Sequence, residues 1–115
     1  MSYRVIALDL DGTLLDDQKR ILPESLEALN LAKKAGVKVL IVTGRHHVAI
    51  HPFYQALDLD TPAICCNGTY LYDYIGKKVL ESDPLTTQET SAVLDLVKQT
   101  DVHHLVYADD AMMYD

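Results

Sequence analysis

The chain has few cysteines and no long apolar segment. Its two cysteines, Cys65 and Cys66, are adjacent and cannot join distant parts of the fold through a disulfide. This usage is typical of a reducing compartment, so we expect a cytoplasmic location. A membrane is not expected as a partner, because no run of about 18 apolar residues occurs. Residues 1–4 also lack the apolar stretch of a signal peptide.

Basic residues are also scarce, which excludes a class of partner. Ten lysines and arginines against 17 aspartates and glutamates give a formal net charge of −7. Nucleic acid is therefore not expected as a partner, because its phosphates repel such a chain. A small phosphorylated metabolite stays compatible with this charge, since one metal ion and local amides can bind a phosphate group.

The chain does contain an apolar run that ends on two carboxylates. Residues 4–9 predict a strand buried on both faces, as in a parallel α/β sheet. Asp9 and Asp11 are two residues apart, so we expect their side chains to converge past the carboxyl end of this strand, where open sheets bind ligands. Two adjacent anions require a cation or a proton between them. Gly12 and Thr13 add amides and a hydroxyl that can bind an anion.

Beyond this motif the pattern predicts alternating helices and strands. Pro23 opens and Gly36 closes a helix, and residues 37–42 predict a second buried strand, which makes a parallel crossover. A helix ending at residue 57 is expected to kink or restart at Pro52. The other predicted elements are a strand at 62–66, a hairpin pairing 70–74 with 78–81 across Ile75-Gly76, a helix from Thr86 to Thr100, and strands at 103–108 and 112–114.

Two sets of apolar side chains indicate packing faces. Tyr70, Tyr72 and Tyr74 alternate along the predicted hairpin and are expected on a half-buried face rather than as a ligand platform. Val93, Leu94 and Val97 are expected on the inner face of the last helix. The fold class is therefore α/β, with a Rossmann-like parallel sheet and a β-hairpin.

The motif Asp9-x-Asp11-Gly12-Thr13-Leu after a buried strand resembles the haloacid dehalogenase (HAD) superfamily of phosphohydrolases. The resemblance implies that Asp9 is the nucleophile and forms an aspartyl phosphate. It also implies Mg²⁺, held by the Asp9 carboxylate and the backbone carbonyl of Asp11. The Asp11 side chain would protonate the leaving group and then activate water. We expect the apolar strands below the site to raise the pKa of one carboxyl so that it can carry this proton.

Thr43-Gly44-Arg45 and Asn67 extend the resemblance. Thr43 follows the second strand, where a hydroxyl and the Gly44 amide at a helix N-terminus could bind phosphoryl oxygens. Together with Asn67, these residues resemble the Cof-type subfamily (subclass IIB), whose members hydrolyse sugar phosphates, pyridoxal phosphate and similar phosphomonoesters. The resemblance implies that Arg45 and Asn67 line the substrate side. We expect one of His46 and His47, which sit a single turn beyond Arg45, to face the substrate, and we assign His46 to the site.

The resemblance covers only the amino-terminal part of such an enzyme. Residues 1–83 match an incomplete hydrolase core, and residues 84–115 match the start of the inserted α/β cap domain. The Gly-Asp-x-x-Asn-Asp segment of the family has no match, since no Gly-Asp pair occurs in the sequence. The later lysine of the family has none either, because Lys77, Lys78 and Lys98 precede or enter the expected cap. We therefore expect the chain alone to be an inactive fragment of a phosphatase. We also expect it to self-associate through an open sheet edge.

Other readings remain open for the chain alone. It could be a noncatalytic α/β fragment that binds phosphate or Mg²⁺ weakly. A receiver-like phosphoacceptor domain is disfavoured, because such a domain needs an aspartate after the third strand, where Cys65, Cys66 and Asn67 stand. The pair His47 and His51 has zinc-ligand spacing, but without a third ligand we do not expect a metal there. A dinucleotide-binding domain is disfavoured, because no Gly-x-Gly-x-x-Gly follows the first strand.

Overall fold

The computed structural model describes residues 3–114. The chain packs as two compact units, Met1–Ser82 and Asp83–Asp115, and each is described by itself. The division falls beside Asp83-Pro84, at the position where the sequence suggests a boundary. Whether the second unit begins a cap domain stays a prediction.

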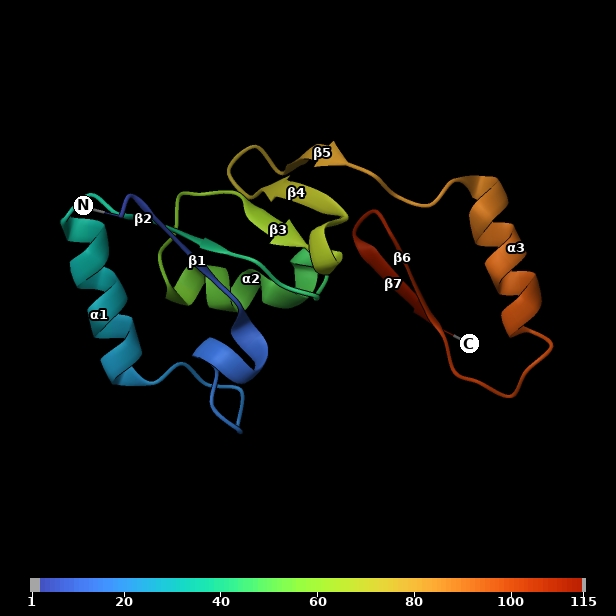
Figure 1. Cartoon of the computed structure of the whole chain (residues 1–115), viewed down its shortest axis with the longest axis horizontal. Coiled ribbons are helices and arrows are strands. Elements are labelled where there is room, and N and C mark those ends of the chain that lie inside the picture. The colour runs from blue at the N-terminus through green and yellow to red at the C-terminus, as the bar shows by residue number, and fades with distance from the viewer. Residues whose placement is uncertain (1–2, 115) are drawn as a thin grey trace. The chain divides into compact units, whose positions relative to one another are not determined.

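The first unit starts with a strand–helix–strand crossover (Figure 1). Strand β1 (Val5–Leu8) pairs in parallel with β2 (Lys38–Ile41), and helix α1 (Pro23–Lys34) connects them. Pro23 opens α1, and the chain leaves it through Gly36 at φ +89°, a left-handed conformation that glycine adopts without strain. Leu29 is buried against the sheet. The predicted parallel crossover and the bounds of its helix are confirmed.

Three further strands continue the first unit. Strands β3 (Ala63–Cys65), β4 (Tyr70–Asp73) and β5 (Lys78–Ser82) form an antiparallel sheet. A parallel bridge between Val42 and Ile64 places β3 beside the end of β2. Asp73 lies opposite Lys78, so the hairpin turn spans 74–77 and is longer than the two residues predicted. The turn is longer because pairing stops at Asp73 and Lys77 adopts a positive φ.

Helix α2 (His47–Ala56) runs without a restart at Pro52. Ile50 and Tyr54, one on each side of the proline, are both buried in the core and hold the helix in one piece. Of the two predicted outcomes, the restart is therefore wrong, because side-chain packing compensates for the hydrogen bond that the proline removes, and the kink stays a prediction. The helix also begins at His47, so residues 43–46 form a loop between β2 and α2.

The core of the first unit lies between its helices and one face of the sheet. Ile6 and Leu8 of β1 pack against it, whereas Val5 is 51% exposed and Ala7 faces solvent. The prediction that β1 is buried on both faces is wrong for the described residues, because they cover only one face of this strand. Within residues 3–114 its one paired neighbour is β2.

The second unit contains helix α3 (Thr87–Val97) and a hairpin of β6 (Leu105–Ala108) and β7 (Ala111–Tyr114). The predicted capping box opens α3, because the Thr86 hydroxyl accepts from the Glu89 amide and the Glu89 carboxylate accepts from the Thr86 amide. No residue of α3 is buried, and Val93 is half exposed. The predicted inner face is thus partly covered, since Leu94 and Val97 are half-buried, and one helix and one hairpin cannot enclose it fully. Among the described residues, no helix has the length and apolarity needed to span a bilayer.

Candidate active site

The candidate site lies where β1 and β2 end. Asp9 directly follows β1 and begins the turn η1 (Leu10–Leu14), whose two leucines are buried and anchor it. The exposed Asp9 carboxylate accepts hydrogen bonds from the Leu10 amide at 2.9 Å and from the Thr13 hydroxyl at 3.4 Å. Gly12 at φ +77° permits the sharp turn. The turn therefore presents Asp9 to solvent at the carboxyl end of the strand.

Asp11 has different partners, which come from two other segments. Arg45 donates through Nη2 to Oδ1 at 2.6 Å and through Nε to Oδ2 at 2.7 Å, while Lys19 Nζ lies 3.0 Å from Oδ1. Because β1 ends at Leu8, both aspartates lie beyond the strand, and the alternation on which their convergence was predicted does not apply. In this structure the cations balance the charge of Asp11, and Asp9 bonds to its own turn.

The environment of Asp11 favours its ionised form. Hydrogen bonds from Arg45 and then from Lys19 hold the pKa of the Asp11 carboxyl well below its usual range. The side chain is 38% exposed, so burial opposes this effect only weakly. The prediction of a carboxyl pKa raised by apolar surroundings is wrong for Asp11, because two cations outweigh the strands beneath it.

The loop after β2 joins the site to β3. The Thr43 amide donates to the Ile64 carbonyl at 2.9 Å, and the Thr43 hydroxyl accepts from the Arg45 amide at 3.0 Å. Thr43 is 3% exposed. The Gly44 amide does not lie at a helix N-terminus as predicted, because the chain pairs with β3 and η2 before α2 begins.

Asn67 and Gly44 approach each other closely. Asn67 lies in the short turn η2 (Cys66–Gly68) at φ +57°, and its amide donates to the Thr43 carbonyl at 3.0 Å. A Cβ atom on Gly44 would lie 2.8 Å from Asn67 Oδ1. Glycine at this position therefore makes room for the asparagine side chain. The structure brings together Thr43, Gly44 and Asn67, as the sequence suggests for one binding site.

Arg45 is oriented by two contacts. Its guanidinium forms the paired hydrogen bonds with Asp11, and it lies 5.4 Å from the centre of the Phe53 ring on α2. A cation over an aromatic face is attracted by the electron density of the ring. Arg45 thus links η1, the loop after β2 and α2.

His46 lies in a buried aromatic cluster. It is 4% exposed, and its ring centre is 4.2 Å from that of His47 and 6.1 Å from that of Tyr70. The Tyr70 hydroxyl accepts from the His47 amide at 2.9 Å, and the His47 ring stacks on buried Tyr72. Burial raises the pKa of the Tyr70 hydroxyl. The hairpin tyrosines form a packing face, as predicted; a substrate contact of His46 stays a prediction.

Lys19 is the residue near the site that sequence reasoning missed. It belongs to a polar segment, 16–20, in which nothing distinguishes it from the neighbouring Arg20. Its contact with Asp11 depends on how residues 15–21 fold back toward η1, and the sequence of this segment contains no motif that predicts such a turn.

The residues present offer a partial set of ligands for Mg²⁺. Among the described residues, no group of three or more histidines, cysteines, aspartates and glutamates could hold a metal ion. Asp9 nevertheless offers an exposed carboxylate, and Asp11 a backbone carbonyl, which are the hard oxygen donors that Mg²⁺ prefers. The donor chemistry therefore fits the ion. The His47 and His51 rings stack on Tyr72 and Tyr74, respectively.

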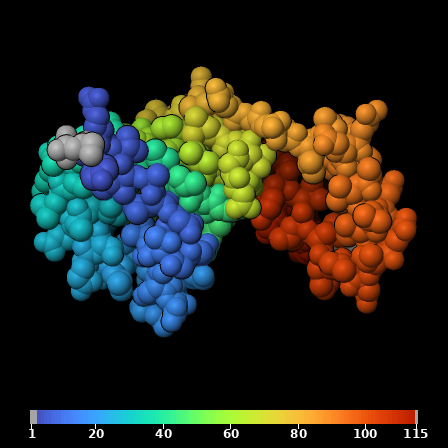
Figure 2. Space-filling model, in the orientation of Figure 1, coloured from blue at the N-terminus to red at the C-terminus, as the bar shows by residue number. Residues whose placement is uncertain are grey.

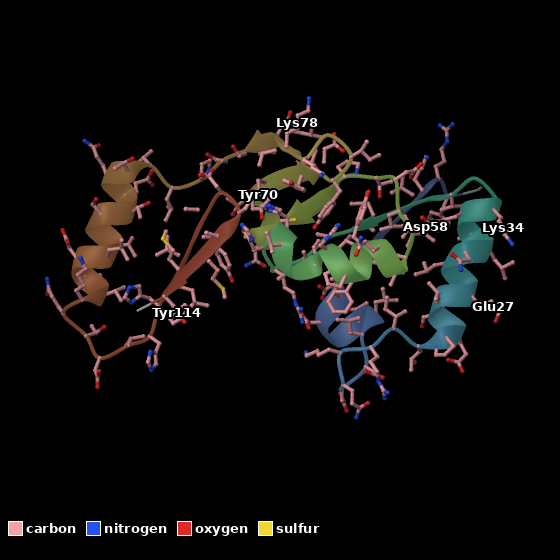
Figure 3. All side chains as sticks on the ribbon, turned by 180° about the vertical axis from the view of Figure 1, so that it is seen from behind. Glu27, Lys34, Asp58, Tyr70, Lys78 and Tyr114 are labelled. Atoms are coloured by element: carbon pink, nitrogen blue, oxygen red, sulfur yellow. The ribbon has the colours of Figure 1, made fainter. Side chains whose placement is uncertain are left out.

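A cavity of about 610 Å³ lies away from this site. It is lined by the end of α1, the start of β2 and the residues that follow α2, including Lys34 and Asp58. Figure 3 shows these two side chains at one end of the first unit, far from Tyr70. None of the predicted site residues lines the cavity, because they gather at the opposite end of the parallel strands.

Comparison with known proteins places the chain in a family. The family model of haloacid dehalogenase-like hydrolases matches residues 6–115. The chain is 61% identical to pyridoxal phosphate phosphatase YbhA of Escherichia coli (strain K12) over 115 residues, all of this chain and 42% of that protein. Three further curated relatives are likewise matched over less than half of their length.

Solved structures agree with this assignment. A hypothetical protein from Geobacillus kaustophilus HTA426 is 31% identical and superposes with a TM-score of 0.80, covering 98% of this chain and 43% of that one. A sugar phosphatase of HAD subclass IIB is 25% identical with a TM-score of 0.83, covering 96% of this chain and 43% of that one. The chain therefore belongs to the haloacid dehalogenase-like hydrolases, in their Cof-type group.

Proposed function

We propose that the full-length protein carrying this chain is a Mg²⁺-dependent phosphatase that acts through Asp9. The observation that carries the proposal is the Asp9 carboxylate, which η1 presents to solvent at the end of β1. A carboxylate in this position is accessible to a phosphorus atom and can act as a covalent nucleophile. The membership of the chain in a hydrolase family supports this reading.

The reaction takes two steps on the residues of this chain. In the first, an Asp9 oxygen bonds to phosphorus while the ester P–O bond breaks, and Asp11 gives a proton to the departing oxygen. In the second, Asp11 takes a proton from water, which attacks the aspartyl phosphate and releases phosphate and free Asp9. Since Arg45 and Lys19 keep Asp11 ionised in this structure, its pairing with them has to loosen before it can carry a proton.

The other site residues bind and orient the substrate. The amide of Gly12 and the hydroxyls of Thr13 and Thr43 would donate to phosphoryl oxygens, with Gly44 beside them. Arg45 and Asn67 would contact the rest of the ester, with His46 behind them in the buried cluster. Mg²⁺ would be held by the Asp9 carboxylate and the Asp11 carbonyl, where it would supply positive charge against the anions of nucleophile and phosphate.

The substrate class we propose is a small phosphomonoester of the pyridoxal phosphate or sugar phosphate type. The support is the 61% identity to a pyridoxal phosphate phosphatase and the fold shared with a sugar phosphatase. The test is phosphate release by the full-length protein from pyridoxal phosphate and from hexose phosphates. We expect hydrolysis of at least one class, which EDTA abolishes and Mg²⁺ restores. Turnover that is indifferent to chelation would contradict the metal, and no turnover of either class would contradict the substrate.

For the isolated chain we propose no catalysis. Among the described residues we propose two Mg²⁺ ligands, and the hydrogen bonds to the Asp9 carboxylate come from the Leu10 amide and the Thr13 hydroxyl rather than from a cation. This favours a noncatalytic fragment that binds phosphate or Mg²⁺ weakly as the second candidate for residues 1–115.

The free cysteines Cys65 and Cys66 support our proposal that the protein works in the cytoplasm.

A further inference from the structure

A hairpin after η1 brings a lysine to the candidate active site. Residues 15–21 fold back on themselves, with a bridge between Leu15 and Ile21 and a hydrogen bond from the Asp16 amide to the Arg20 carbonyl at 2.9 Å. Leu15 is buried and Ile21 packs against the core, so the base of the hairpin is anchored. Its tip projects from the first unit (Figure 2).

Lys19 has an uncommon backbone conformation that its neighbours maintain. Its φ is +62°, in the left-handed region that residues other than glycine rarely adopt. The Lys19 amide donates to the Asp16 carbonyl, and Asp16 Oδ1 accepts from the amides of Gln18 and Arg20, each at 2.9 Å. Strained residues held in place by their surroundings occur often at functional sites. The hairpin therefore fixes where the Lys19 side chain starts.

The Lys19 ammonium adds a charge that Asp11 does not need for neutrality. It lies 3.0 Å from Asp11 Oδ1, while Arg45 already balances the carboxylate through two hydrogen bonds. Asp11, Arg45 and Lys19 together carry a net charge of +1, which the Asp9 carboxylate of the same site offsets until Asp9 binds phosphorus or Mg²⁺. The Lys19 side chain is 58% exposed, so its ammonium can also reach a bound molecule.

We propose that Lys19 is a specificity residue that binds an anionic group on the leaving portion of the phosphomonoester. The inference rests on the proposed function, in which the Asp11 side chain serves the leaving group. Because the Lys19 ammonium lies 3.0 Å from Asp11 Oδ1, it would lie near the leaving portion of an ester that Asp11 serves. Lysine is a compact charge on a flexible stem, so it can follow a carboxylate or a second phosphate whose position varies among substrates.

The test compares two esters that differ in one charge, glycerol phosphate and phosphoglycerate, in which a carboxylate replaces a hydroxymethyl group. Their dissociation constants are measured by titration calorimetry with Mg²⁺ in full-length Asp9→Asn protein, in which the nucleophile is removed and the side-chain oxygen of asparagine remains available to the ion. The same measurement is made after adding Lys19→Met, Lys19→Arg or Lys34→Met. Lys34 is an exposed lysine at the other end of the first unit, so its variant matches the change in charge (Figure 3).

We expect the Asp9→Asn protein, the parent of these variants, to bind phosphoglycerate more tightly than glycerol phosphate. Lys19→Met should reduce the ratio of the two dissociation constants about fivefold, as loss of a solvent-exposed charge pair would. Lys19→Arg should retain most of the preference, and Lys34→Met all of it. An unchanged preference in Lys19→Met would overturn the proposal. Equally weaker binding of both esters by Lys19→Met, which a purely structural role predicts, would also overturn it. The proposal would fail as well if the parent bound neither ester.

Hydrolysis by the protein with Asp9 intact separates this inference from the proposed function. In one outcome, Lys19→Met loses the binding preference while the protein with Asp9 intact hydrolyses no ester; in that case the proposed function fails and the assignment of Lys19 stands. If the protein with Asp9 intact hydrolyses esters and Lys19→Met binds both with the original preference, the proposed function stands and the assignment fails.

Discussion

At the scale of single residues, the two aspartates of the motif are in different electrostatic states. Asp9 is bound by the amide and hydroxyl of its own turn, whereas two cations hold Asp11. Asp9 is therefore available to an incoming ligand, while Asp11 would have to exchange partners before it could transfer a proton. The two carboxylates thus differ in their hydrogen bonds, and the roles that we propose for them differ as well.

Replacement of Asp11 by asparagine should separate metal binding from turnover. Asp11→Asn keeps the backbone carbonyl that is proposed to bind Mg²⁺ but removes the group that carries the proton. We expect kcat to fall by about 10²- to 10⁴-fold, the usual contribution of general acid–base catalysis, with a much smaller change in Mg²⁺ affinity. Titration calorimetry on the full-length protein measures the affinity. Complete loss of Mg²⁺ binding would contradict this assignment.

The lowered pKa of Asp11 predicts that the free energy of unfolding decreases in acid. Because the pKa of this carboxyl is lower in the folded state than in the unfolded state, the ion pairs stabilise the fold above the unfolded value, near 3.9. This stability is lost as the pH falls from there through the folded pKa. Solvent screening limits it to at most about 1 kcal/mol. Urea unfolding of the full-length protein and of Arg45→Met at pH 7 and at acid pH should show their stabilities converging in acid; a constant difference would argue against the pair.

At the scale of elements, the loop after β2 depends on a close approach between Gly44 and Asn67. A Cβ atom at position 44 would meet Asn67 Oδ1 at 2.8 Å, and this atom ends a side chain that can rotate away. Gly44→Ala should therefore move the Asn67 side chain while changing the free energy of unfolding by less than about 1 kcal/mol. On this basis we expect the loop to orient the Asn67 side chain, for which we propose a ligand contact, more than it stabilises the fold.

Kinetics on the full-length protein can check this reading of Gly44. We expect Gly44→Ala to raise KM several-fold and to change Tm little. Gly36→Ala is the matched control: Gly36 has φ +89° and lies after α1, so alanine there should lower stability by about 1 kcal/mol and leave KM unchanged. Equal effects of the two variants on KM would contradict a role of Gly44 in ligand binding.

How far the sequence predicts these elements depends on whether the contacts are local. Helix α1 and its crossover follow from Pro23, Gly36 and the apolar pattern, which act over neighbouring residues. The pairing of Arg45 with Asp11 joins residues 34 apart, and no local pattern encodes it. The continuity of α2 through Pro52 depends in the same way on the burial of Ile50 and Tyr54.

At the scale of the whole molecule, large apolar surfaces face solvent. One face of β1 is open, and Leu96, Met112 and Met113 of the second unit are each at least half exposed. The chain spans about 42% of the length of its relative from Escherichia coli. Open strand edges and apolar faces favour association.

We therefore expect the isolated 115-residue chain to self-associate and to release no phosphate from esters. Light scattering measures its mass in solution, and a phosphate-release assay measures activity on material whose length is verified by mass spectrometry. The full-length protein is the positive control in both experiments. A monodisperse monomer would contradict the first expectation, and turnover by that monomer would contradict the second.

The central claim is that Asp9 carries the phosphoryl group during turnover. The most direct measurement is acid quenching of the full-length protein within a single turnover of pyridoxal phosphate or a hexose phosphate, followed by mass spectrometry of the peptide that contains Asp9. The account predicts a phosphoryl group on Asp9, and neither this adduct nor measurable hydrolysis in Asp9→Asn. Hydrolysis at a near-native rate by Asp9→Asn, or a phosphoryl group on another residue, would contradict it.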